Sequence, residues 1–413
     1  MRTIMMLSAV TATLGGCKWT EFDDLSSETW VVATSKPDVK SSDYGVAIQR
    51  GDLASASGGT LAVIGAGPPT YSELTYSATG GSSLGSNKLQ LGADAGIVSF
   101  DPQPPFLLAN PTTSEVALIT NGDASSIVVA RGEHTLTVKQ QFVNTVTGVT
   151  GIPATPTAAT YMLPPPKTPG GPTPLTQPIV AAGDFVLGEI VSPQIACKLV
   201  DGATGIGVRA LGVVRTGTAD DVLAWGASGK LYRYAGSVFY GCATQAPVGM
   251  PYDTKFVPAI GSQILTVDDT HVVLQGHQDP RTGDGGFLQL FDSTTLMPVG
   301  NTVSANRLRT AAILDVAGTK YVIAGYPTEA VDGTTAGLVN LYRITATGLE
   351  TTPVATLHDA QPESNQSFGR SVAAMPFNGK QVIAVAADNE IFVYFRANLS
   401  DGTALYNEVR QGR

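Results

Sequence analysis

The groups best suited to chemistry gather in one short stretch of the chain. It contains an imidazole, two carboxylates and a guanidinium, contributed by His277, Asp279, Arg281 and Asp284. A loop that gathers such groups can present a polar or ionic site to a ligand. Solvated turn residues would give the same pattern, so both interpretations stay open. We treat these four residues as a candidate ligand loop.

No metal site is predicted at this stretch. His271 lies shortly before it, and an apolar strand separates His271 from His277. At the rise of a β-strand the two imidazoles would lie roughly 20 Å apart. Nitrogen ligands of one zinc ion lie only about 2 Å from the metal, so the two histidines cannot share an ion.

Two further patterns have the letters of known motifs without their context. Gly65 and Gly67 follow an apolar segment, as in a dinucleotide-binding turn, but Thr70 stands where the third glycine would fall and no helical period follows. Ser83 is the centre of a Gly-x-Ser-x-Gly pattern, but it lies in a polar stretch rather than between a strand and a helix. We therefore predict no cofactor and no catalytic residue, and hence a protein that is not an enzyme.

The elements that must position these residues are short strands. Glycine (46) and proline (26) are abundant, only 14% of the 413 residues are charged, and no long amphipathic helical stretch occurs. An aromatic run, Tyr232, Tyr234, Phe239 and Tyr240, is interpreted as strand packing, with a sugar-binding platform as the alternative. The net charge is −9, and no basic run could neutralise a phosphate backbone, so no nucleic-acid partner is expected.

The strands recur as a repeat. An apolar strand ends at a small residue, a polar loop follows, and a second strand ends in an aromatic residue. The small residue falls at Gly65, Thr120, Gly226, Gly276, Gly325 and Ala386. The spacing is about fifty residues, the length of one propeller blade, and one gap is twice as long. A degenerate copy at 185–191 and 195–200 fills it, so the sequence predicts an all-β chain with seven blades, with six or eight left open.

Two segment pairs carry a resemblance to a known family. They are 44–48 with 61–67, and 368–373 with 382–385. These segments resemble FG-GAP repeats, the blade type of the integrin alpha-chain propeller and of many bacterial envelope proteins. The resemblance implies a seven-bladed β-propeller whose top loops contact ligands.

Many repeats of this family carry an Asp-rich calcium loop between the first two strands of a blade. Calcium takes six to eight oxygen ligands, but the corresponding loops here, at 49–55, 314–319 and 375–380, each offer one carboxylate or none. We therefore expect these loops to bind no calcium and to turn through glycine.

The amino terminus has the pattern of a targeting segment. Arg2 precedes a short apolar core at 4–10, and the sequence Leu-Gly-Gly leads directly to Cys17. This pattern resembles the lipobox of bacterial lipoproteins, which implies a signal peptide at 1–16 and a lipid on Cys17. A secretory signal with a chance cysteine is the alternative. The lipoprotein interpretation predicts a lipidated tether at 17–36, a propeller at 37–413 and outer-membrane location, with the lipid as sole membrane contact.

Outside the inner membrane, cysteines can pair. The two remaining ones, Cys197 and Cys242, are therefore predicted to form a disulfide. A stretch rich in proline, 153–178, is predicted to be a loop, because proline lacks the donor that a central strand needs. Ring closure is expected from an N-terminal strand, either 30–33 or 44–48, that pairs beside 391–395 in the last blade.

Together these patterns predict a monomeric, lipid-anchored propeller of the cell envelope. It would serve as a binding or scaffolding module for a protein or glycan, on the periplasmic face or the cell surface. Two alternatives remain: an enzyme of the propeller class that acts on envelope glycans or peptides, and a factor that assists outer-membrane assembly. An enzyme should gather carboxylates or histidines at one mouth of the central channel, whereas a scaffold should expose an apolar or edge-strand patch.

Overall fold

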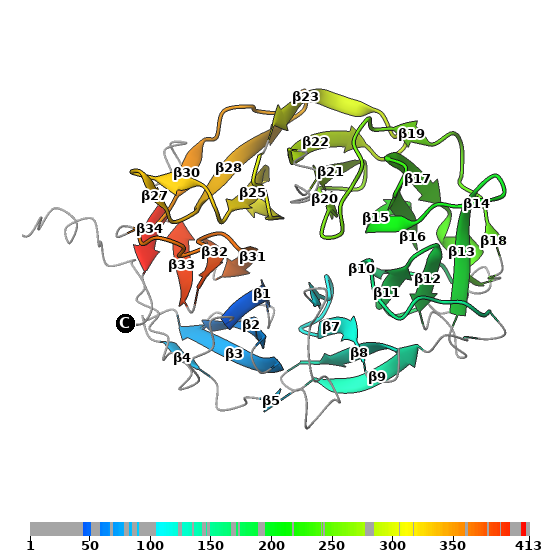
Figure 1. Ribbon diagram of the computed structural model, residues 1–413, viewed down its shortest axis with the longest axis horizontal. Coiled ribbons are helices and arrows are strands. Elements are labelled where there is room, and N and C mark those ends of the chain that lie inside the picture. The colour runs from blue at the N-terminus through cyan, green and yellow to red at the C-terminus, as the bar shows by residue number, and fades with distance from the viewer. Residues whose placement is uncertain are drawn as a thin grey trace, which may run out of the picture.

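Seven sheets, whose strands pair antiparallel except for one short parallel pair, stand around a common axis in the computed structural model of this chain (Figure 1). The structure describes residues 44–409 except for 51–57, 67–68, 78–81, 85–88, 91–104, 123–125, 134–135, 143–145, 147–148, 167–170, 172–173, 189–194, 217–218, 241, 243, 277–284, 305, 317, 360–361, 378–379, 389 and 397–405. The prediction of an all-β, seven-bladed propeller is therefore confirmed. The proposed signal peptide at 1–16, Cys17 and the tether at 17–36 lie outside the described residues.

Each blade is built from strands that follow one another along the chain, starting with the innermost. Blade 1 contains β1 (Tyr44–Arg50), β2 (Gly58–Ala66), β3 (Pro69–Ser77), β4 (Ser82–Leu84) and β5 (Leu89–Gln90), and blade 2 contains β6 (Phe106–Ala109), β7 (Val116–Asn121), β8 (Ile127–Gly132) and β9 (Thr137–Phe142). Blade 3 contains β10 (Ala158–Met162), β11 (Gln177–Ala182), β12 (Phe185–Gly188), β13 (Ile195–Asp201) and β14 (Thr204–Gly205).

Blades 4 to 7 follow the same order. Blade 4 contains β15 (Val208–Thr216), β16 (Ala219–Gly226), β17 (Lys230–Tyr234) and β19 (Tyr252–Asp253), with the 3-10 helix η1 (Gly236–Tyr240) and β18 (Thr244–Gln245) between its last two strands. Blade 5 contains β20 (Gln263–Thr266), β21 (His271–Gly276), β22 (Phe287–Asp292) and β23 (Pro298–Ser304). Blade 6 contains β24 (Thr310–Val316), β25 (Thr319–Tyr326), β28 (Leu338–Thr345), β29 (Gly348–Leu349) and β30 (Ala355–Leu357), with the hairpin β26 (Ala330–Val331) and β27 (Thr334–Thr335). Blade 7 contains β31 (Ser371–Phe377), β32 (Lys380–Ala387), β33 (Glu390–Arg396) and β34 (Tyr406–Val409).

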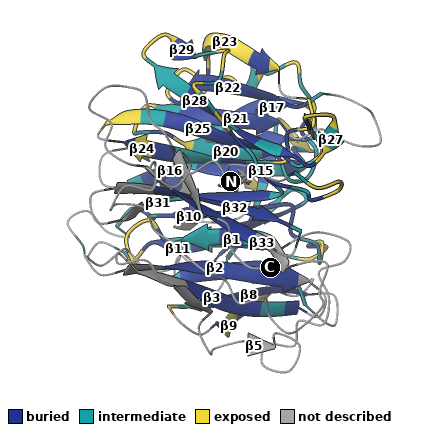
Figure 2. Ribbon diagram, turned by 90° about the vertical axis from the view of Figure 1, so that its left-hand side faces the viewer, coloured by how far each residue is buried: buried dark blue, intermediate teal, exposed yellow. Residues whose placement is uncertain are grey.

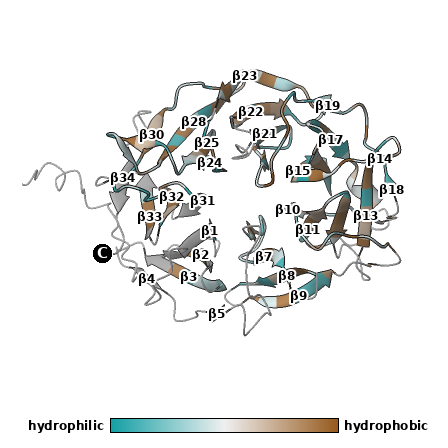
Figure 3. Cartoon of the chain, in the orientation of Figure 1, coloured by the Kyte–Doolittle hydropathy of each residue, from teal (hydrophilic) through white to brown (hydrophobic). Residues whose placement is uncertain are grey.

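The second strand of each blade is apolar on both faces because each blade is covered on both sides. In β2, Leu61 and Val63 belong to the cluster shared with blade 7, whereas Ala62 and Ile64 belong to the cluster shared with blade 2. Side chains alternate between the faces of a strand, so burial on both faces requires a continuous apolar run. Figure 3 shows the hydrophobic colour along β11, the second strand of blade 3.

Seven hydrophobic clusters hold the ring together, one at each interface between neighbouring blades. Figure 2 shows the buried residues concentrated in the stacked strands and the exposed ones at turns and outer strands. A hydrogen bond also crosses every interface. In order around the ring these bonds run from Arg50 Nη2 to Asn110 O, Tyr161 Oη to Glu115 Oε1, Leu163 N to Asp220 Oδ2, Thr266 Oγ1 to Val213 O, Ala311 N to Gln263 Oε1, Tyr394 Oη to His358 O and Ile48 N to Ser371 Oγ.

The ring closes by packing of blade 1 on blade 7, and the predicted strand exchange is wrong for 44–48. That segment lies in β1, which pairs with β2 of its own blade. The outer partner of β33 is β34, from the C-terminal end of the chain. Ile48 instead donates its backbone N–H to Ser371 Oγ, at 3.1 Å, across the closing interface. The other candidate, 30–33, lies outside the described residues.

Blade 3 corrects two predictions. The segment 153–178 is not a continuous loop, because it contains the innermost strand β10 and the start of β11, where Pro178 pairs with Tyr161. The prolines flank a proline-free strand, Ala158–Met162, so every residue of that strand keeps its backbone donor. The degenerate repeat copy at 185–191 and 195–200 therefore corresponds to the third and fourth strands of blade 3, β12 and β13. In the other blades the small residue of the repeat falls on the second strand.

Three loops were predicted to bind no calcium and to turn through glycine, and one of them, 314–319, is described except for residue 317. Val316 pairs with Thr319 across the turn, and Gly318 has φ +85°, a conformation that favours glycine. Its N–H donates to Asp315 Oδ1 at 2.9 Å, so this carboxylate serves the turn. Among the described residues, no group of three or more His, Cys, Asp or Glu side chains could hold a metal ion. No helix in the described part of the chain is long and apolar enough to span a bilayer.

One buried amide predicts a stabilising substitution. Gln275 in β21 is fully buried, and neither its Oε1 nor its Nε2 has a hydrogen-bond partner. Because an unsatisfied buried polar group costs about 1–3 kcal/mol, Gln275→Met should raise the free energy of unfolding by about 1 kcal/mol in urea denaturation.

Gln289 in β22 provides the matched control. It is 4% exposed, but its Nε2 donates to Leu290 O and Val299 O, both at 3.1 Å. Gln289→Met should therefore lower the free energy of unfolding. Loss of stability in both variants would show that the Gln275 amide is satisfied in solution.

Candidate functional site

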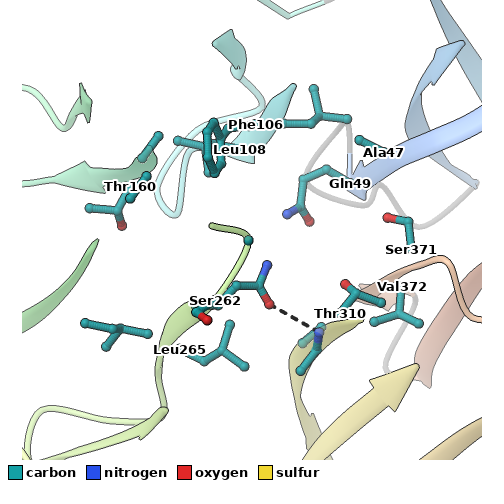
Figure 4. A pocket seen from close by; sticks show the side chains of 18 of the residues that line it. Ala47, Gln49, Phe106, Leu108, Thr160, Ser262, Leu265, Thr310, Ser371 and Val372 are labelled. Carbon is teal, nitrogen blue, oxygen red and sulfur yellow. Dashed lines mark hydrogen bonds between the residues drawn. The ribbon is translucent and has the colours of Figure 1, made fainter. Parts of the chain in front are cut away.

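A cavity of about 470 Å³ lies at the centre of the ring (Figure 4). All seven innermost strands contribute to its lining, and so do the residues that immediately precede several of them. Its volume falls in the range of small-ligand sites, roughly 300–1,000 Å³. The cavity is therefore large enough to receive a side chain or a small group of a ligand.

Position along the innermost strands decides which residues reach the cavity. In β1, the neighbours Ile48 and Gln49 both line it, although Ile48 also packs in the closing interface. In β24, Thr310 is half-buried and lines the cavity, whereas Leu314, further along the strand, is fully buried between blades 6 and 7 and does not. Both faces of β24 pack on neighbouring blades, since Ala311 belongs to the cluster shared with blade 5 and Leu314 to the cluster shared with blade 7.

Uncharged polar side chains from several blades converge on the cavity. Figure 4 shows those of Gln49, Thr160, Ser262, Thr310 and Ser371 around its wall. Some of these groups also connect blades: Ser371 Oγ accepts from Ile48 N. The dashed line in Figure 4 marks the corresponding bond in blade 5, from Ala311 N to Gln263 Oε1, at 3.2 Å. Such bonds hold the wall in one conformation.

Two arginines bring positive charge to the same cavity. Arg309 and Arg370 each lie immediately before the first residue of an innermost strand, in blades 6 and 7. The Arg309 N–H donates to Gly325 O at 2.9 Å. A Cβ added to Gly325 would come within 2.1 Å of Gly369 O. The backbones of the two arginine segments therefore approach each other around Gly325, where only glycine leaves room.

The surroundings of Arg309 differ from those of a surface arginine. The side chain of Arg309 is accessible to solvent in the cavity, but the surrounding blades partly desolvate its guanidinium. This desolvation and the nearby charge of Arg370 lower the pKa of Arg309. A guanidinium nevertheless stays protonated at neutral pH. Arg370 Nη1 is oriented by Asp388 Oδ1 at 2.9 Å. Two cations thus line one cavity in a chain of net charge −9.

The lining has a simple chemical inventory. Every polar side chain among the described lining residues is a hydroxyl, an amide or a guanidinium. Hydroxyls and amides hydrogen-bond without changing charge, and guanidinium forks bind carboxylate or phosphate oxygens in pairs. The arrangement is therefore suited to holding a ligand that presents an acidic group among neutral polar ones.

Most residues of the sites predicted from the sequence lie outside the part of the chain that the structure describes. His277, Asp279, Arg281 and Asp284 lie outside the described residues, as does Cys17. His271 begins β21 and forms a hydrogen bond through Nδ1 with Asp268 Oδ1 at 3.0 Å, away from the cavity lining.

The predicted disulfide is confirmed. Cys197 and Cys242 are bonded, with 4.8 Å between their Cα atoms. Cys197 lies in β13, and Cys242 follows η1. The bond therefore fastens the excursion of blade 4 to the outer part of blade 3, where β18 also pairs with β13 in parallel.

The aromatic run is confirmed as strand packing for Tyr232 and Tyr234, which lie in β17, whereas Phe239 lies in the 3-10 helix η1. All three are at most 1% exposed and belong to the cluster between blades 3 and 4. Sequence reasoning missed Arg309 and Arg370. Their only local signal is that each directly precedes an apolar strand at the start of a repeat.

No protein-family model matches the chain, and no curated protein matches its sequence. Solved structures match it in fold, with 604 chains in all. One is the crystal structure of BBS1N in complex with ARL6DN, soaked with lead: it is 13% identical, has a TM-score of 0.53, and the match covers 88% of this chain and 95% of that chain. The same complex soaked with mercury is 12% identical, with a TM-score of 0.48 and coverage of 82% and 91%. At such identity the likeness shows the propeller fold alone.

Proposed function

We propose that this protein is a lipid-anchored binding module of the cell envelope, and that its central cavity receives an acidic group of a protein or glycan ligand. The observation that carries the proposal is the polar lining of the cavity, which combines Arg309 and Arg370 with hydroxyls and amides. Guanidinium groups supply charge-assisted, bidentate hydrogen bonds. The surrounding neutral groups supply orientation, as in most ligand sites.

A binding role suits this lining better than catalysis. General acid–base chemistry uses groups whose pKa lies near the working pH, whereas the described polar lining groups keep one protonation state at neutral pH. An enzyme acting on envelope glycans or peptides, and an assembly factor for outer-membrane proteins, remain the alternatives. Turnover of a cell-wall fraction by the purified protein would favour the enzyme.

The fold supports the proposal at a general level. Propellers are rigid rings with loops that often serve recognition, and the neighbour BBS1N was crystallised in complex with ARL6DN. The repeated segments resemble FG-GAP blades of envelope proteins. We assign the chain to that type on the residues of its first and last blades, and expect it to act as a monomer.

The envelope location rests on the cysteines. Cys17 follows Leu-Gly-Gly near the start of the chain, and the disulfide Cys197–Cys242 fits an oxidising compartment. We expect Cys17→Ser to move the protein from the membrane fraction to the soluble fraction when cells are fractionated. Unchanged recovery with the membrane would contradict lipidation at Cys17, and the disulfide variant Cys242→Ser should stay with the membrane as a control.

The cavity is tested by what co-purifies with the anchored protein. After crosslinking in cells, the wild-type protein should recover a specific envelope protein or glycan. The double variant Arg309→Ala, Arg370→Ala should recover at least tenfold less, because one lost charge-assisted hydrogen bond costs about 1.5–3 kcal/mol.

Arg307→Ala is the matched control, since Arg307 lies two positions from Arg309 but does not line the cavity. Equal recovery by the double variant and by this control would rule out the cavity as the site.

A further inference from the structure

A second cavity lies on the ring between blades 4 and 5. Its volume is about 580 Å³, and it shares no lining residue with the central cavity. The walls come from the segment around β19 in blade 4 and from β22 and β23 in blade 5. We call it the blade 4–5 groove; the residues used below are Tyr252, Phe256, Phe287, Phe291, Ser304 and Asn306.

Aromatic rings form much of this groove. Phe287 and Phe291 are buried, at 8% and 2% exposure, whereas Tyr252 and Phe256 are half-buried. The ring of Phe256 meets that of Phe287 edge-on with centroids 4.4 Å apart, and Tyr252 meets Phe291 edge-on at 5.6 Å. These contacts fix the ring planes before any ligand arrives.

The backbone of the groove wall is fixed as well. Thr254 Oγ1 donates to Gly229 O at 2.6 Å and anchors the wall to the neighbouring turn. Lys255 has φ +62°, a conformation that costs a residue with a side chain energy and tends to mark functional segments. On the other wall, Gln289 Nε2 ties β22 to β23 through its bond to Val299 O, and it also donates to Leu290 O of its own strand.

The groove is close to neutral in charge. Lys255 is its one charged lining residue among those described, and its Nζ pairs with Asp253 Oδ2. The other polar lining side chains are uncharged. They are the hydroxyls of Tyr252, Thr254, Thr302 and Ser304 and the amides of Gln289 and Asn306, the last of which lies over Gly285. An anionic or cationic ligand would therefore find no uncompensated opposite charge in the described lining.

We infer that the blade 4–5 groove binds a neutral sugar chain. A purely apolar ligand would cover the hydroxyls and the amide without giving them partners, at a cost for each. A sugar ring has apolar C–H faces that can pack on the aromatic rings and neutral hydroxyls that can bond to Tyr252, Ser304 and Asn306.

Calorimetric titration of the full-length protein with neutral oligosaccharides tests the inference. The probes are cellohexaose, maltohexaose and chitohexaose, with a hyaluronan oligosaccharide as an anionic counterpart. At least one neutral probe should bind, and more tightly than hyaluronan. Tyr252→Ala and Asn306→Ala should each weaken that affinity by about tenfold, the equivalent of one lost hydrogen bond or ring contact.

Asn301→Ala is the matched control, because Asn301 is exposed on β23 but does not line the groove. Tyr252→Phe keeps the ring and removes only the hydroxyl, so it serves if Tyr252→Ala fails to fold. The double variant Arg309→Ala, Arg370→Ala should bind the sugar normally, which separates this inference from the proposed role of the central cavity.

Three results would overturn the inference. The first is that no neutral probe binds, and the second is that a probe binds equally well to the groove variants. The third is that peptides from a casein digest bind with the same dependence on Tyr252 and Asn306. Peptides are the competing class of ligand because Met250, Val257 and Met297, near the groove in sequence, expose 88%, 63% and 53% of their surface.

Discussion

The substitution Val382→Asp is expected to lower the free energy of unfolding by about 3–5 kcal/mol, because it places an unpaired charge in the interface that closes the ring. Val382 is fully buried in the cluster where blade 7 packs on blade 1, together with Leu61 and Val63. Among the described strands, none is exchanged between these two blades. The described contacts that hold the first and last blades together are the packing at this interface and the bond from Ile48 N to Ser371 Oγ.

Thermal and urea unfolding of the variant, followed by circular dichroism, would measure this effect. Val354→Asp is the control, since Val354 is 45% exposed and a surface substitution usually changes stability by at most about 0.5 kcal/mol. If the two variants lost the same small amount, the closing interface would not be a packed core.

Removal of the disulfide is expected to have an effect of similar size. The bond joins residues 45 positions apart, and closing a loop of that length stabilises a protein by about 4 kcal/mol in the chain-entropy model. Cys197 is fully buried in the cluster between blades 3 and 4. Cys242→Ser should therefore lower the free energy of unfolding by about 2–4 kcal/mol.

Denaturation with and without a reductant separates the bond from the side chain. The wild-type protein should lose stability when dithiothreitol is added, and Cys242→Ser should not respond to it. A wild-type protein that unfolds at the same urea concentration in both conditions would show that the bond contributes nothing in solution.

The architecture could be predicted because the repeats have a simple physical cause. Each blade needs apolar side chains on both faces of its second strand, and this requirement leaves continuous runs such as Leu61 to Ile64 in the sequence. Strands flanked by prolines, or lacking a continuous apolar run, are harder to recognise in the sequence. In blade 3 the prolines around Ala158–Met162 hid the innermost strand.

Blade 1 shows the same limit. Its third strand, Pro69–Ser77, is rich in Tyr, Ser and Thr and does not end in an aromatic residue, as the repeat would predict. A strand whose buried residues include Ser72 and Glu73 lacks the apolar alternation on which the prediction depended.

The central site could not be predicted from local patterns. Arg309 and Arg370 belong to different blades, and both line the central cavity where the backbone of Gly369 lies close to Gly325. Spacing along the chain does not encode that contact, since it depends on how neighbouring blades pack. By contrast, the disulfide followed from cysteine count and compartment alone, because it needed no knowledge of the ring.

Site-specific photocrosslinking from the channel tests the proposed binding role most directly. A photoreactive residue would replace Thr310, which lines the cavity, and in a second protein Thr352, which is exposed outside it. On irradiation of cells, the residue at 310 should capture an envelope protein or glycan, and this product should be lost when Arg309 and Arg370 are both alanine. Capture at 310 no greater than at 352, or capture that persists without the two arginines, would contradict a ligand site in the central cavity.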